Sequence, residues 1–95
     1  MSKGDHKITL VFIINGIEYP VHVNIEAPLA VAVERALVES RNTGRPPDEW
    51  EVRNVAGVLL EKDRTIEDLG LTNGTRLFLS LRVGAGGKYT WLMQR

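Results

Sequence analysis

Residues 8–25 read ITLVFIINGIEYPVHVNI, two runs of β-branched and aromatic residues separated by Asn15-Gly16. Asn-Gly between two such runs is the strongest short signal for a β-hairpin, because a type I′ turn needs a positive φ at both central positions. The stretch therefore predicts strands over residues 8–14 and 17–25. Pro20 cannot donate to a ladder, so we expect the second strand at an edge of the sheet. Such an edge leaves self-association open as a property of the chain.

A helix is expected directly after the hairpin. Pro28 suits the first turn of a helix, where its missing N–H costs nothing. Apolar residues then recur at helical spacing from Leu29 to Leu37 and form one stripe, which predicts a helix running to about Arg41. Pro46-Pro47 prevents any continuation.

The second half of the chain reads as short elements. We expect a strand over 50–55, a return strand over 58–61 after Ala56-Gly57, and a last strand over 75–83. Thr65 and Asp68 have the form of a helix-capping box, which indicates one helical turn. With the first and last strands parallel neighbours, this order predicts an α+β chain of β-grasp architecture. A mixed sheet of four to five strands is crossed by one helix.

Length and composition exclude several classes of protein. The 95 residues suffice for one domain, and 12 basic residues balance 12 acidic ones. Nucleic-acid binding and membrane association therefore have no support, and no run reaches the ~20 apolar residues of a membrane span. There is no cysteine, so a thiol nucleophile and a thiolate metal site are absent. His6 and His22 lack partners at ligand spacing. We expect a cytoplasmic protein that is not an enzyme and has no metal or other cofactor.

The last predicted strand runs into Gly84-Ala85-Gly86-Gly87. Glycine loses more conformational freedom on folding than any other residue, so this segment is not expected to pack. A chain without side chains can thread a narrow enzyme cleft and offers a carbonyl carbon with little steric shielding. The alternative interpretation is a simple linker or tail.

Three segments, in the right order, resemble ubiquitin: Gly44-Arg45-Pro46-Pro47-Asp48-Glu49, Leu60-Glu61-Lys62-Asp63-Arg64-Thr65-Ile66-Glu67-Asp68, and Leu77-x-Leu79-x-Leu81-Arg82. The similarity covers about residues 8–87 and is weakest in the helix. It implies a flexible start at 1–7, a ubiquitin-like domain at 8–83 and a glycine-rich C-terminal segment at 84–95.

The resemblance implies a protein modifier. In that family the terminal glycine carboxylate is activated with ATP, passed to a cysteine of an activating enzyme and then to a conjugating enzyme, and ends as an isopeptide on a target lysine. Gly86 and Gly87 match the conjugated end. Arg82 matches the arginine that contacts the activating enzyme.

Residues 88–95 (KYTWLMQR) follow the glycines, so the chain as written has no free carboxylate at Gly87. We expect a precursor that a processing peptidase cleaves after Gly87, with Gly86 the less favoured terminus. Alternatively, the tail is a structural element, because Tyr89, Trp91 and Leu92 are costly to leave in water.

Two departures restrict what the resemblance implies. The apolar recognition patch of ubiquitin falls on Ile14, Arg53, Phe78 and Ser80, two of them polar, so ordinary ubiquitin receptors should bind poorly. The chain also lacks lysines where ubiquitin most uses them for chains.

Because the match to ubiquitin is partial and the glycine segment reads Gly-Ala-Gly-Gly, the chain most resembles bacterial ubiquitin-like proteins encoded beside activating, conjugating and deconjugating enzymes, some of them linked to antiphage defence. Two other functions stay open: a β-grasp sulfur carrier with a C-terminal thiocarboxylate, and a non-covalent interaction module.

Overall fold

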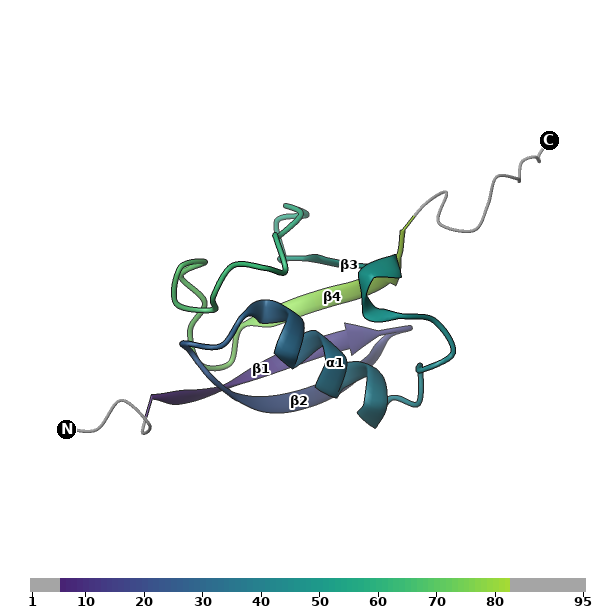
Figure 1. Cartoon of the computed structure of the whole chain (residues 1–95), viewed down its shortest axis with the longest axis horizontal. Coiled ribbons are helices and arrows are strands. Elements are labelled where there is room, and N and C mark those ends of the chain that lie inside the picture. The colour runs from purple at the N-terminus through teal and green to yellow at the C-terminus, as the bar shows by residue number, and fades with distance from the viewer. Residues whose placement is uncertain (1–5, 83–95) are drawn as a thin grey trace.

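A mixed sheet crossed by one helix makes up the part of the chain that the computed structural model describes, residues 6–82 (Figure 1). Residues 1–5 and 83–95 lie outside the described part. The elements are β1 (Lys7–Ile14), β2 (Ile17–Asn24), α1 (Leu29–Glu39), the 3-10 helix η2 (Pro47–Glu49), β3 (Trp50–Arg53) and β4 (Arg76–Leu81). The strands lie in the order β2-β1-β4-β3. This confirms the predicted β-grasp fold.

The N-terminal hairpin has the predicted geometry. Ile14 pairs with Ile17, and the turn residues Asn15 and Gly16 have φ values of 53° and 82°. These positive values are what a type I′ turn requires. β2 lies at the sheet edge, as Pro20 predicted. That edge is further covered at one point, because Arg35 Nη1 of α1 donates to the His22 carbonyl over 2.7 Å.

The first and last strands, β1 and β4, are neighbours in the middle of the sheet. β1 and β4 run parallel, with Val11 opposite Arg76 and Ile13 opposite Phe78. β3 then pairs antiparallel to β4, with Trp50 opposite Leu81. The predicted parallel contact of first and last strands is therefore confirmed. It places the end of β4 next to the start of β3.

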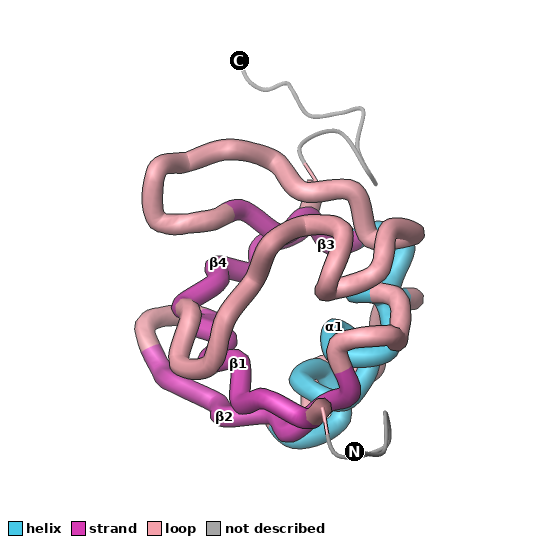
Figure 2. The backbone as a smooth tube through the Cα atoms, turned by 90° about the vertical axis from the view of Figure 1, so that its left-hand side faces the viewer, coloured by secondary structure: helices cyan, strands magenta, loops and turns pink. Residues whose placement is uncertain are grey.

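The hydrophobic core lies between α1 and one face of the sheet (Figure 2). The helix buries its predicted stripe, and every strand contributes alternate residues to the same layer. In residues 6–82 no polar or charged residue is buried. The buried residues are Leu10, Phe12, Ile14, Val21, Val23, Leu29, Ala32, Val33, Ala36, Leu37, Trp50, Val52, Ile66, Leu77 and Leu79.

The helix is shorter than predicted at both ends. Pro28 is the N-cap in an extended conformation, with φ −63° and ψ 149°, and does not belong to the first turn. At the other end Arg41 has a φ of 62°, and the N–H of Asn42 donates to the Leu37 carbonyl over 2.7 Å. A left-handed residue followed by such a bond closes a helix, so α1 stops at Glu39.

The predicted return strand over 58–61 is wrong. Asn54 ends β3 because its Oδ1 accepts hydrogen bonds from the N–H groups of Ala56 and Val58. Beyond the turn only an isolated bridge joins Arg53 and Leu59. In a continued antiparallel ladder, the Trp50 carbonyl would accept a hydrogen bond from a backbone N–H. Here it accepts a hydrogen bond from Lys62 Nζ instead.

The predicted turn at 65–69 is present. Thr65 Oγ1 accepts from the N–H of Asp68 over 3.0 Å, and the Thr65 carbonyl accepts from the N–H of Leu69 over 3.1 Å. The first bond is the capping contact that the Thr65 and Asp68 spacing predicted. Ile66 in this turn is fully buried and belongs to the hydrophobic core.

Candidate functional site

The candidate site is the point where the chain leaves the sheet at Arg82. Its N–H donates to the Glu49 carbonyl over 2.8 Å, and its Nη1 donates to the Asp48 carbonyl over 3.0 Å. Main chain and side chain of one residue are thus both held by η2. Gly86 and Gly87, the predicted conjugation and cleavage residues, lie outside the described residues.

Lys62 binds the same segment from the other side. Its Nζ donates to the Pro47 carbonyl over 2.7 Å and to the Trp50 carbonyl over 2.6 Å. Four successive carbonyls, from Pro47 to Trp50, therefore accept hydrogen bonds from Lys62 or Arg82. We call this assembly of η2, Trp50, Lys62 and Arg82 the exit corner. It fixes the position of Arg82, the last residue that the structure describes.

Burial lowers the pKa of the Lys62 ammonium from its ordinary value of 10.5. Asp48 opposes this shift, Arg82 adds to it, and Glu51 opposes it. Sequence analysis missed this role of Lys62. The contact spans twelve to fifteen residues, and no local pattern marks such a long-range side-chain bond to a carbonyl.

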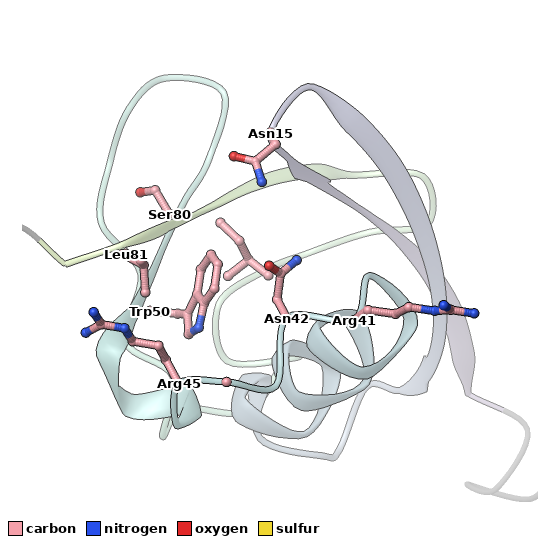
Figure 3. A pocket seen from close by; sticks show the side chains of 9 residues that line it. Asn15, Arg41, Asn42, Arg45, Trp50, Ser80 and Leu81 are labelled. Carbon is pink, nitrogen blue, oxygen red and sulfur yellow. The ribbon is translucent and has the colours of Figure 1, made fainter.

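Trp50 is a packing residue, with 6% of its surface exposed. Its indole Nε1 has no hydrogen-bond partner among the described residues. The ring forms one wall of a cavity of about 460 Å³ below the β1–β2 turn. Figure 3 shows the side chains of Asn15 and Asn42 directed toward this space, whereas the guanidinium groups of Arg41 and Arg45 point away from it.

Among the described residues, no Asp, Glu or His side chain lines this cavity. Arg45 forms an ion pair with Glu49 at 3.0 Å, and the other polar side chains of the lining are two amides, the Arg41 guanidinium and the Ser80 hydroxyl. Across residues 6–82 there is no group of three His, Cys, Asp or Glu side chains that could hold a metal ion. His22 is engaged structurally, because its Nδ1 lies 2.7 Å from Thr9 Oγ1.

The outer face of the sheet differs from the apolar patch that the resemblance implied. Ile14 is 2% exposed and faces the core, so it is not part of any surface. Arg53 is held by Glu51 at 3.1 Å and by the Gly57 carbonyl at 3.1 Å. Of the four matched positions, Phe78 is the exposed apolar one, at 41%. Poor binding by ordinary ubiquitin receptors stays a prediction.

Two further observations concern membranes and the accessibility of lysines. In the described part of the chain, no helix has the length and apolar character to cross a bilayer. Of the two lysines in residues 6–82, Lys62 is tied to carbonyls, whereas Lys7 is exposed at the start of β1. Lys7 is therefore the more accessible amine of the two.

Solved structures with the same fold include ubiquitin from Caldiarchaeum subterraneum. It superposes with a TM-score of 0.67 at 20% identity, covering 85% of this chain and 99% of that one. A designed protein based on ubiquitin gives a TM-score of 0.70 at 24% identity, covering 90% of this chain and all of the other. Identities this low show the fold alone, which is that of a ubiquitin-like protein.

A closer relative in sequence is the uncharacterized protein y4jI of Sinorhizobium fredii (strain NBRC 101917 / NGR234). It is 38% identical over 92 residues, which cover 90% of this chain and 71% of the relative. Residues 3–87 match a family described as Protein of Unknown function (DUF2604). The match ends at Gly87 and leaves residues 88–95 outside it. The chain therefore belongs to this family of unknown function, and its fold is ubiquitin-like.

Proposed function

We propose that this chain is a non-enzymatic ubiquitin-like modifier, made as a precursor. A processing peptidase hydrolyses the Gly87–Lys88 bond and leaves a free carboxylate on Gly87. An activating enzyme then converts that carboxylate and ATP into an acyl-adenylate and pyrophosphate. Its cysteine thiolate displaces AMP to form a thioester, which passes to a conjugating enzyme and then to a target lysine as an isopeptide.

The observation that carries the proposal is the exit corner. Arg82 is held through both main chain and side chain by η2, immediately before a segment of three glycines, an alanine and a valine. A folded domain followed in sequence by residues without bulky side chains suits an acyl donor for other enzymes. The family match that ends at Gly87 gives independent support. The expected setting, in bacteria beside genes for such enzymes and linked to antiphage defence, is part of this proposal.

The test uses the chain ending at Gly87 with ATP and the activating and conjugating enzymes encoded near its gene. We expect a band on a non-reducing gel that disappears with dithiothreitol, as a thioester does. The full chain with Lys88–Arg95 and the chain ending at Ala85 are the matched controls and should form no thioester. A thioester on the full chain, or none on the chain ending at Gly87, contradicts the proposal.

Two other functions of the same fold give different outcomes in this experiment. A sulfur carrier ends with one sulfur in place of one oxygen in the Gly87 carboxylate, which mass spectrometry detects, and it forms no isopeptide. A non-covalent interaction module keeps its function in the chain ending at Ala85. Either result overturns the modifier proposal.

A further inference from the structure

A groove of about 550 Å³ lies beside the exit corner, between β3 and residues 59–63. Trp50, Leu59 and Leu60 supply its apolar part, and Leu59 is 51% exposed. An apolar side chain left this open loses the free energy that burial of its surface yields. The groove is therefore an apolar surface with room for further side chains.

The rim of the groove carries three carboxylates, those of Glu51, Glu61 and Asp63, against two basic side chains. The two basic residues that also line it, Lys62 and Arg82, direct hydrogen bonds to the carbonyls of residues 47–50. Glu51 forms an ion pair with Arg53 at 3.1 Å, and Glu61 lies 3.9 Å from the guanidinium of Arg64. A ligand with an apolar centre and basic ends fits this groove.

Residues 88–95 have that composition. Tyr89, Trp91, Leu92 and Met93 form an apolar centre, and Lys88 and Arg95 carry positive charge at its ends. The neighbouring cavity below the β1–β2 turn has no carboxylate in its lining, whereas the groove has three, which favours the groove as the place for a basic segment. The charges of the two hollows thus select the groove beside β3.

The segment also starts within reach. Arg82 lines the groove, and residues 83–87 separate it from Lys88. Five residues span about 17 Å at most, and three glycines among them permit a reversal of direction. A link of this length sets an effective concentration on the order of millimolar, so weak contacts suffice for occupancy.

We propose that residues 88–95 occupy the groove formed by β3 and residues 59–63 in the uncut chain. The segment is then a ligand of this groove that belongs to the same chain. The docking itself does not require the proposed modifier function. It needs only the sequence of the segment and the groove.

The first experiment compares methyl NMR spectra of the full chain and the chain ending at Gly87. We expect shifts at the methyl groups of Leu59 and Leu60, with nuclear Overhauser contacts to the Trp91 ring in the full chain. The methyl groups of Val38, on the far side of α1, should not move. Identical spectra at Leu59 and Leu60 overturn the proposal. Shifts that grow with protein concentration also overturn it, because they indicate a second copy in the groove.

The second experiment adds the synthetic peptide KYTWLMQR to the chain ending at Gly87. The double variant Glu61→Lys with Asp63→Lys should weaken binding roughly threefold to tenfold, as the loss of two exposed charge pairs implies. The matched control, Glu34→Lys with Glu39→Lys on α1, should bind like the parent. If both double variants weaken peptide binding equally, or if neither weakens it, the groove beside β3 is not the binding site of residues 88–95. Both experiments use no enzyme, so their outcome is separate from that of the thioester test.

Discussion

The hairpin–helix half of the molecule and the exit corner are held together by different forces. In the first, Phe12 and Val33 are fully buried among other apolar side chains. In the second, Lys62 and Arg82 reach backbone carbonyls of residues 47–50. Apolar burial is large and non-directional, whereas each hydrogen bond is smaller and has a defined direction. The difference indicates that one half supplies stability and the other sets where the chain leaves the sheet.

The strongest test of this contrast is Phe12→Ala in the centre of β1. Phe12 is 0% exposed, so the change removes buried carbon atoms and leaves a cavity. We expect the free energy of unfolding to fall by about 3–5 kcal/mol. Urea unfolding followed by circular dichroism measures it. Phe12→Leu, which keeps most of the volume, should cost about 1.5 kcal/mol or less. Equal losses for the two variants would sink the view that packing dominates this half.

Lys62→Met tests the exit corner with a smaller expected effect. Methionine keeps much of the side-chain volume but cannot donate to the carbonyls of Pro47 and Trp50. We expect a loss of about 1–3 kcal/mol in the free energy of unfolding. The amide proton of Arg82 should also exchange faster, because its acceptor segment loses two tethers.

The matched control is Lys7→Met. Lys7 is exposed at the start of β1, and surface changes of this kind usually stay within about 0.5 kcal/mol. If both lysine variants lose the same stability, the carbonyl contacts of Lys62 contribute nothing specific, and the contrast between the two halves fails.

Arg82→Gln should have a smaller effect still, about 0.5–1.5 kcal/mol. The side-chain bond to the Asp48 carbonyl is weakened, whereas the main-chain bond to the Glu49 carbonyl is retained. Hydrogen exchange should therefore accelerate at residues 81 and 82 and stay unchanged at Phe12. Acceleration throughout β1 would mean that Arg82 stabilises the whole fold and does not act locally.

Much of the fold was predictable because its signals are local. Asn15-Gly16 specified the turn, Pro20 the edge, and the spacing from Leu29 to Leu37 the buried stripe of α1. The return strand at 58–61 was predicted wrongly for a physical reason. Its sequence suits a strand, but Lys62 Nζ takes the Trp50 carbonyl that would have continued the ladder.

The candidate site was less predictable from the residues. Arg82 was singled out through a resemblance, as a contact for an activating enzyme. Its bond to the Asp48 carbonyl spans 34 residues, and its pairing with η2 follows only from the placement of β4 beside β3. Lys62 had no signal at all, since a lysine in a turn is ordinarily a solvated residue.

The smallest expected effect is a pH dependence that Lys62 alone contributes. Burial places its pKa in the folded chain below 10.5, so between these two values the unfolded chain binds more protons. The contribution of Lys62 to the free energy of unfolding therefore rises with pH through that window and is constant below it. A neutral amine still has N–H groups for the carbonyls of Pro47 and Trp50, so the tether survives deprotonation.

Urea unfolding of the parent chain and of Lys62→Met, from neutral pH up to 10.5, isolates the contribution of Lys62 because other groups cancel in the difference. The stability advantage of the parent should grow as pH rises. An advantage that shrinks would show that the carbonyls hold the charged form more strongly than burial disfavours it, which would make the exit corner an electrostatic tether.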